Sequence, residues 1–224
     1  MIITIDGPSA AGKGTVARLL AARLGMRAVD TGALYRAVAW WIGKNGLDPD
    51  KDEEIQRAIA RFPLSVTWDG EGRMRVMCGT EDISEALRSE EVGMLASRVS
   101  ARRVVRESLW RIQRDLARSG RMIFEGRDTG SQVFPDADFR FYLTASLEER
   151  ARRRFLELAE RGVGTSIEEV AKRMELRDRQ DATRALAPLK IPEGAHVIDT
   201  TGLTPGEVVD RMVEVVGTRV RHEH

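Results

Sequence analysis

The sequence predicts an α/β fold in which helices flank a central parallel sheet. The first observation is a set of short apolar runs with the composition of strands buried on both faces: residues 2–5, 122–124, 139–143 and 196–198. The second is that stretches with helical spacing of apolar residues separate these runs. Strands that alternate with helices indicate parallel pairing, with helices on both faces of the sheet.

The first run leads into a glycine-rich turn. After residues 2–5 the chain reads Gly7-Pro-Ser-Ala-Ala-Gly12-Lys13, which matches the pattern G-x-x-x-x-G-K, and helical spacing follows from Val16 to Leu24. Strand, glycine loop and helix form the context in which this pattern, the P-loop, binds phosphate. Glycines let several backbone N–H groups point at one anion, and the helix adds its positive N-terminal dipole. The expected phosphate-binding residues are Gly7, Pro8, Ser9, Ala10, Ala11, Gly12, Lys13, Gly14 and Thr15.

Two residues of this turn carry specific expectations. Lys13 is expected to reach the β- and γ-phosphates of a nucleotide as a mobile charge. Position 14 is Gly, so the hydroxyl of the motif arrives one residue late, at Thr15. Direct ligation of a metal by Thr15 is therefore open, and contact with a phosphate while water completes the metal shell is the alternative.

The next part of the chain interrupts the strand–helix rhythm. Residues 27–29 are expected to be extended, Thr31 to cap a helix over about 33–44, and residues 51–61 to form a charged helix. Alternation over 64–68 and 73–78, around the turn Asp69-Gly-Glu-Gly72, predicts a β-hairpin. We interpret residues 63 to about 83 as the core of an inserted subdomain, and helical spacing resumes from Ser84 to about Arg118.

The remaining helices follow the later strands. The pattern predicts helices from Ser146 to about Arg161 and from Thr204 to Val216. Between them, Ser166 and Glu169 have the spacing of a capping box that starts another helix.

Composition limits the classes of function. The chain has 224 residues with 36 basic and 35 acidic side chains, so no bulk charge indicates binding to a nucleic acid polymer or an anionic membrane. No apolar run approaches the length of a membrane span, and no signal peptide is recognised. Cys78 is the only cysteine, which excludes an internal disulfide. We expect a soluble cytoplasmic protein, with a frayed terminus rather than a metal site at His222-Glu-His224.

Three further stretches can supply a second anion site. Arg36 follows the helix start at Asp30-Thr31-Gly32, and Glu125-Gly-Arg127-Asp128 follows a strand, where ligands of open α/β sheets bind. Arg177, Asp181 and Arg184 have the spacing of one helix face. Each stretch has an ordinary alternative, a solvated surface arginine or a self-paired row of charges. Their convergence with a P-loop favours a second phosphate, which the guanidinium fork matches.

Taken together, these residues resemble the bacterial cytidylate kinase family over nearly the whole chain. The segments that carry the resemblance are I-D-G-P-S-A-A-G-K-G-T at 5–15, D-T-G-A-L-Y-R at 30–36, the hairpin insert, E-V-G-M-L-A-S-R-V-S at 91–100, V-R-E at 105–107, E-G-R-D-T-G at 125–130, V-F-P-D-A at 133–137 and R-D-R-Q-D-A-T-R-A-L-A-P-L at 177–189. Thr129 stands where the family usually carries an aliphatic residue, and Ser131-Gln132 replaces more apolar positions.

The resemblance implies an ATP-dependent kinase that uses Mg²⁺ and converts CMP or dCMP into CDP or dCDP, in pyrimidine nucleotide metabolism. It implies one P-loop domain of three layers, with a core over 1–36 and 119–217, an inserted monophosphate-binding subdomain over about 37–118 and a short arginine-rich lid over about 150–165. We expect a monomer. Catalysis would fall to Lys13, Arg127, Arg150 and Arg154, the last two on the lid helix.

The resemblance also assigns the acceptor nucleotide. It places Thr31 near the bound nucleotide, Arg36, Arg127 and Arg177 at its phosphate, Ser97, Arg106 and Asp128 at the cytosine, and Asp181 with Arg184 at the ribose. Ser97 and Arg106 are nine residues apart, on opposite faces of a straight helix. If both contact the base, the chain must bend between them, near Ser100.

Two rivals are less well supported. An adenylate kinase is expected to show D-G-[FY]-P-R after the middle strand, where this chain has E-G-R-D. A nucleotide-dependent switch of the GTPase kind is expected to carry N-K-x-D, which the sequence lacks. Turnover of CMP, as opposed to binding alone, separates an enzyme from a switch.

Overall fold

The computed structural model describes residues 1–222, and the side chains of residues 1–218. Glu223 and His224, part of the triplet expected to fray, lie outside the described residues. Contacts divide the chain into two compact units, one formed by Met1–Met26 with the chain from Met122 onward and the other by Arg27–Arg121. The expected functional boundaries near residues 37 and 118 stay a prediction.

The first unit contains most of a parallel sheet and the helices attached to it. Its elements are β1 (Ile2–Asp6), α1 (Lys13–Leu24), β6 (Met122–Gly126), the π-helical turn η2 (Thr129–Val133), β7 (Phe139–Thr144), α6 (Leu147–Glu160), α7 (Ile167–Thr183), β8 (His196–Asp199) and α8 (Pro205–His222). Strand β1 pairs in parallel with β6 on one side and with β7 on the other, and β7 pairs in parallel with β8. The predicted strands and their parallel pairing are confirmed.

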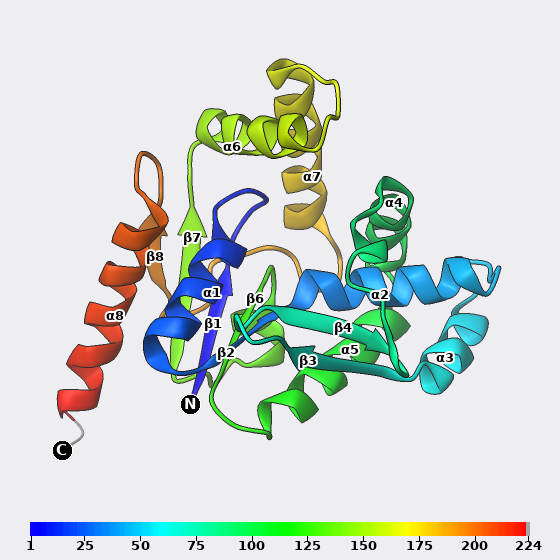
Figure 1. The fold of residues 1–224 in the computed structure, drawn as a ribbon, viewed down its shortest axis with the longest axis horizontal. Helices are drawn as coiled ribbons and strands as arrows, with labels where there is room; N and C mark the ends of the chain where they lie inside the picture. The colour runs from blue at the N-terminus through cyan, green and yellow to red at the C-terminus, as the bar shows by residue number, and fades with distance from the viewer. Residues whose placement is uncertain (223–224) are drawn as a thin grey trace. The chain divides into compact units, whose positions relative to one another are not determined.

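Burial explains why the sequence predicted these strands well. With β2 (Arg27–Asp30) included, the sheet order is β2-β6-β1-β7-β8, so β1 and β6 are interior strands. Ile3, Ile5 and Phe124 are fully buried. A strand covered on both faces must be apolar at successive positions, which gives the continuous runs seen in the sequence. Helices α1 and α8 pack together beside the sheet, and α6 begins beyond the carboxyl end of β7 (Figure 1).

The second unit begins with β2 and carries the hairpin. It continues through α2 (Thr31–Lys44), α3 (Asp52–Arg61), β3 (Leu64–Trp68), β4 (Met74–Cys78), β5 (Glu81–Asp82), the 3₁₀ turn η1 (Ala86–Arg88), α4 (Glu90–Val99) and α5 (Arg103–Ala117). Strands β3 and β4 are antiparallel, with Val66 opposite Val76, so the predicted hairpin is confirmed. The two-residue strand β5 pairs with β4 and was not predicted. It is too short to show an alternating pattern.

Two details of this unit differ from expectation. Asp30, rather than Thr31, caps α2, because its carboxylate accepts a hydrogen bond of 2.9 Å from the N–H of Ala33. Thr31 is already helical, and only 4% of it is exposed. The helix expected from Ser84 to Arg118 is broken into η1, α4 and α5. The bend predicted near Ser100 is confirmed, since α4 ends at Val99 and α5 begins at Arg103.

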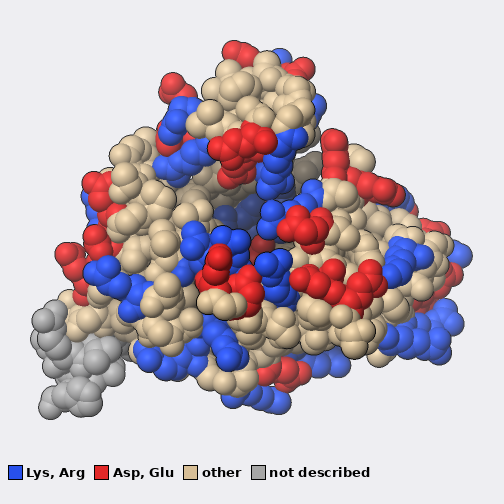
Figure 2. Space-filling view, viewed as in Figure 1, with Lys and Arg blue, Asp and Glu red and all other residues tan. Residues whose placement is uncertain are grey.

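Charges of both signs are spread over the face shown in Figure 2, as expected from nearly equal numbers of basic and acidic residues. Within the described residues, the helices are all too short or too polar to cross a membrane.

We expect Ser166→Ala to destabilise the first unit without changing the fold. The capping box is present: the Ser166 hydroxyl accepts a bond of 3.2 Å from the N–H of Glu169, whose carboxylate in turn accepts from the N–H of Ser166. Loss of such a cap costs about 1 kcal/mol. Urea unfolding monitored by circular dichroism measures the change, with Ser65→Ala in β3 as the matched exposed serine. Equal stability of the two variants would contradict the prediction.

Candidate active site

The P-loop joins β1 to α1 and is shaped by its glycines. Gly7 has a φ of 149°, and a Cβ built on it would lie 2.0 Å from the carbonyl oxygen of Leu143, so a side chain cannot be placed there. Gly12 has a φ of 87° and directly precedes α1, which starts at Lys13. The loop therefore ends at a helix N-terminus, where free N–H groups and the helix dipole favour an anion.

Lys13 lies at the first position of that helix and is buried, with 6% of its surface exposed. Its ammonium donates a hydrogen bond of 2.7 Å to the carbonyl oxygen of Pro8. Burial and, to a lesser extent, the positive charge of Arg127 lower the pKa of Lys13, whereas Glu125 and Asp6 act in the opposite direction, and the net pKa is about 7. A buried, partly neutral lysine gains most from an anion that restores its charge.

The turn after β6 brings a second cation to the loop. The Arg127 guanidinium donates a hydrogen bond of 3.0 Å to the carbonyl oxygen of Gly7, and its Nε pairs with Asp181 of α7 at 3.1 Å. Arg127 thus connects the P-loop with α7. Asp128, the next residue, is 5% exposed, and the Glu125 carboxylate lies 3.6 Å from where a Cβ on Gly14 would be. Charged residues therefore lie at the carboxyl end of β6, where open α/β sheets bind their ligands.

The residues expected at the end of α7 are arranged differently from the prediction. Asp181 pairs with both Arg127 and Arg184, the latter at 3.4 Å. The helix ends at Thr183, and Arg184 has a ψ of 134°. The prediction that Arg177, Asp181 and Arg184 share one helix face is therefore wrong for Arg184. A guanidinium bond of 2.9 Å to the carbonyl oxygen of Ala187 holds Arg184 beyond the helix end.

The two predicted lid arginines have unequal environments. Arg150 is 7% exposed and pairs with Asp178 of α7 at 2.6 Å. Its guanidinium also donates a hydrogen bond of 3.4 Å to the carbonyl oxygen of Ser9 in the P-loop. Arg154 pairs with Glu157 at 2.9 Å, and 40% of its side chain is exposed. Arg150 is fixed between two elements of the first unit, whereas Arg154 faces solvent on its own helix.

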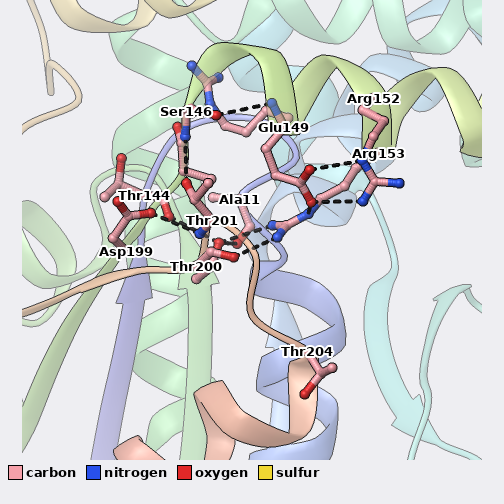
Figure 3. A network of polar contacts seen from close by, with 12 residues as sticks. Ala11, Thr144, Ser146, Glu149, Arg152, Arg153, Asp199, Thr200, Thr201 and Thr204 are labelled. Carbon is pink, nitrogen blue, oxygen red and sulfur yellow. Dashed lines mark hydrogen bonds and ion pairs between the residues drawn. The ribbon is translucent and has the colours of Figure 1, made fainter.

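Arg153 belongs to the arginine-rich lid helix that the resemblance implies, with Arg150, Arg152 and Arg154, but it was not among the residues expected to be catalytic. The structure places it beside the P-loop. Its guanidinium donates to both the hydroxyl and the carbonyl oxygen of Thr200, at 3.0 and 2.7 Å (Figure 3). The buried Thr200 hydroxyl also contacts the carbonyl oxygens of Ala11, at 3.3 Å, and Thr144, at 3.0 Å. An ideal Cβ on Gly12 would lie 3.7 Å from the Arg153 guanidinium. Thr200 and Arg153 therefore join the P-loop to the ends of β7 and β8.

The acid partner of Arg153 was visible in the sequence. Glu149 precedes it by four residues and accepts bonds from Arg152 and Arg153 at 2.8 to 2.9 Å. The bonds from Arg152 and then from Arg153 lower the pKa of Glu149 to about 2. This spacing is the usual helical ion pair. The spacing predicts that Arg153 is held by an ion pair with Glu149, but no local pattern in the sequence predicts Thr200 as its second partner.

The other predicted site residues belong to the second unit. Arg36 of α2 pairs at 3.2 Å with Asp30, the residue that caps this helix. Arg106 is 1% exposed, and its guanidinium lies over the Tyr35 ring, 5.3 Å from the centroid, with a bond of 3.3 Å to the Tyr35 hydroxyl. Ser97 is exposed on α4. Within this unit the structure holds both arginines in fixed positions on or near α2.

Comparison with known proteins decides the family. The family model described as cytidylate kinase matches residues 3–218. The chain belongs to the cytidylate kinase family. A protein named cytidylate kinase from Geobacter sulfurreducens is 45% identical over 221 residues, which cover 99% of this chain and 94% of that protein. A protein of the same name from Geobacter sp. is 46% identical over 220 residues, covering 98% and 94%. As a member of this family, the chain is an ATP-dependent nucleoside monophosphate kinase.

Similarity to a solved structure supports the fold alone. An uncharacterised protein from Eubacterium ventriosum aligns over 97% of this chain and 98% of its own, with a TM-score of 0.54 and 10% sequence identity. The α/β architecture is therefore shared with proteins whose sequences have diverged far from this one.

We expect ATP binding to take up a proton above neutral pH. Because the pKa of Lys13 is about 7 in the free protein, much of its ammonium is deprotonated at about pH 8, and phosphate charge raises the pKa again. Calorimetry at that pH, with excess Mg²⁺ and buffers of different ionisation enthalpy, should show uptake approaching about one proton per ATP. Lys13→Met should abolish the uptake and Lys51→Met should retain it. Uptake that persists in Lys13→Met would assign the proton to another group.

Proposed function

We propose that the protein transfers the γ-phosphoryl group of ATP to CMP or dCMP and releases ADP with CDP or dCDP. The family match over residues 3–218 supports the reaction class. The structural observation that carries the proposal is Arg127, which contacts the P-loop at Gly7 and α7 at Asp181. A single cation is thereby held between the expected donor-phosphate loop and the helix that bears Arg177. This is the position from which a transferring phosphoryl group can be neutralised.

In this reaction, the main task of the protein is to position the two nucleotides and neutralise phosphate charge. The acceptor oxygen belongs to a phosphate that is already largely ionised at neutral pH, so a strong general base is not required. In the proposal, Lys13, Arg127, Arg150 and Arg154 neutralise charge on the donor phosphates, and the P-loop residues 7–15 hold them. Arg150 already reaches the carbonyl oxygen of Ser9, which supports a place beside that loop. Exclusion of water would prevent hydrolysis in place of transfer.

The metal in the proposal is Mg²⁺, carried by the phosphates of ATP. Mg²⁺ prefers phosphate, hydroxyl and water oxygens and retains several of its waters. Thr15 is exposed at the start of α1, two residues after Lys13, so its hydroxyl is available to a phosphate or to that hydration shell. When bound, the metal would supply positive charge that neutralises the donor phosphates. Among the described side chains, those of residues 1–218, no cluster of three or more His, Cys, Asp or Glu suited to a metal is found.

The acceptor nucleotide is assigned to the residues that the family resemblance implies. We place Arg36, Arg127 and Arg177 at the acceptor phosphate, and Asp181 with Arg184 at the ribose. Arg177 lies close enough to Lys13 to lower its pKa, which supports a position near the donor loop. Thr31 lies near the bound nucleotide in this assignment. The monomeric state and the cytoplasmic location stay predictions.

Base recognition is assigned to Ser97, Arg106 and Asp128. Cytosine presents an amino donor at N4 beside an acceptor at N3, whereas uracil reverses both. Asp128 can accept from N4, and Arg106 with the Ser97 hydroxyl can donate to N3 and O2. Arg106 and Asp128 are 1% and 5% exposed, so a mismatched base would leave polar groups unpaired away from water.

Turnover with CMP tests the reaction directly. A coupled assay of ADP release across CMP, dCMP, UMP, AMP and GMP should show activity with the two cytidine monophosphates and far less with the purines. Lys13→Ala should lower kcat with CMP by roughly a thousandfold or more, because it removes charge from the transferring group. A folded wild-type protein that binds ATP but transfers nothing to CMP would refute the proposal, and so would a Lys13→Ala variant within a few-fold of wild type.

Replacement of Asp128 tests base choice separately. Wild type should prefer CMP over UMP by up to about four orders of magnitude in kcat/KM, the range reached when a dry polar site rejects a mismatched partner. Asp128→Asn should narrow this gap, since an amide can present either a donor or an acceptor at position 4 of the base. If Asp128→Asn lowered kcat/KM for CMP and UMP equally, Asp128 would not read the base. Asp136→Asn, the same substitution at an exposed aspartate of the first unit, is the matched control.

A further inference from the structure

Asp6 is a buried carboxylate for which the proposed reaction has no role. It ends β1 directly before the P-loop and is fully buried. One carboxylate oxygen accepts from the N–H and the hydroxyl of Thr129, at 2.9 and 2.8 Å, and the other accepts from the N–H of Gly130, at 2.7 Å. A buried charge is tolerated when it is hydrogen-bonded in this way. All three donors come from the segment that follows Arg127 and Asp128.

The packing around these bonds is close. A Cβ built on Gly130 would lie 2.7 Å from the Thr4 hydroxyl oxygen and 3.2 Å from the Asp6 carboxylate, so the turn lies directly on β1. Thr129 itself is 1% exposed. The π-helical turn that begins at Thr129 is a form common at functional sites, where it redirects the chain. Its start is thereby fixed to the end of β1 by two backbone bonds and one side-chain bond.

The charged and titratable groups that act on Asp6 come from three directions. Lys13 of α1 and Tyr142 of β7 each have a pKa shifted by the Asp6 charge, and the Asp128 charge acts on Asp6 itself. Burial raises the pKa of Asp6, the bonds from Gly130 and Thr129 lower it in part, and the net pKa is about 6. Asp6 is therefore ionised at the neutral pH at which the three bonds are needed.

We propose that Asp6 is a positioning residue for the acceptor nucleotide, holding the Arg127–Asp128 turn in place through Thr129 and Gly130. The proposal rests on the proposed function, because it assigns the turn to CMP. Thr129 is the residue that departs from the aliphatic type expected from the resemblance, and its hydroxyl supplies the third bond. In this chain, the strand that leads into the donor loop thus also fixes the turn that reads the acceptor.

The test compares substitutions that remove one bond at a time. Thr129→Val removes the hydroxyl at nearly constant volume and should lower kcat/KM for CMP on the order of tenfold, with KM for ATP unchanged within about twofold. Asp6→Asn sets an amide N–H₂ against a backbone N–H and should lower kcat/KM for CMP on the order of a hundredfold. Thr129→Ser keeps the hydroxyl and should restore wild-type kinetics. Thr4→Val, an isosteric change on the same strand beside Gly130, is the control and should change neither constant.

The pH profile distinguishes positioning from a loss of stability. Activity with CMP should fall as Asp6 is protonated, because a protonated carboxyl no longer accepts all three bonds. Removing the Thr129 hydroxyl bond raises the pKa of Asp6, so the acid limb of kcat/KM for CMP should move to higher pH in Thr129→Val and stay in place in Thr129→Ser. The phosphate of CMP titrates in the same region, but the protein substitution leaves its pKa unchanged.

The outcomes separate this proposal from the proposed function. If wild type fails to phosphorylate CMP, the function is wrong, and calorimetric binding of CMP by the same variants still tests the turn. The decisive case is an active wild type with a Thr129→Val variant whose melting temperature is lower. If kcat/KM for CMP and the acid limb of this variant are unchanged at a temperature where it is folded, Asp6 has a structural role alone. That result would overturn the proposal. Equal losses for ATP and CMP would overturn it as well.

Discussion

The close contact between Gly7 and strand β7 is the constraint on which this end of the sheet depends. With a Cβ position only 2.0 Å from the Leu143 carbonyl oxygen, the chain can leave β1 only through a glycine. This contact sets where the P-loop begins, and the left-handed Gly12 sets where it ends. Both ends of the loop are therefore fixed by backbone packing, so its N–H groups can be directed at an anion before any ligand binds.

Charge burial around this loop explains the hydrogen bonds that surround it. Lys13 and Asp6 are both buried, and burial disfavours the ion in each, lowering the lysine pKa and raising the carboxylate pKa. Each charge raises the stability of the other, and backbone groups satisfy both, through Pro8 for the lysine and through Thr129 and Gly130 for the carboxylate. The site holds opposite charges in a dry environment, where an incoming phosphate interacts strongly.

The sequence predicted the features that follow from short-range rules. Interior strands carry short runs rich in apolar residues, glycine loops have a fixed spacing, and the capping box at Ser166 needs only two residues three apart. The errors occur where a short-range rule allows two solutions. Asp30 and Thr31 are both good caps, and only the position of the helix start selected Asp30. Helical spacing placed Arg184 on the same face as Arg177 and Asp181. Its hydrogen bond to the carbonyl oxygen of Ala187, beyond the helix end, cannot be predicted from that spacing. Arg153 was not singled out within the arginine-rich helix, because its second partner, Thr200, is distant in sequence and adjacent only in the fold.

The lid arginines differ in how readily they can exchange partners for a phosphate. Arg154 and Glu157 form an exposed pair on one helix, and such pairs contribute about 0–1 kcal/mol, so Arg154 can leave Glu157 at little cost. Arg150 is buried against Asp178, and separating a buried pair leaves an uncompensated charge. Arg150 is therefore suited to hold α6 against α7 and the P-loop while it contributes its charge from a fixed position. Arg153 lies between these extremes, since its bonds to Thr200 fix it at the loop while its pair with Glu149 remains close to solvent. In the proposed function, this helix would therefore supply both a fixed cation, Arg150, and an exchangeable one, Arg154.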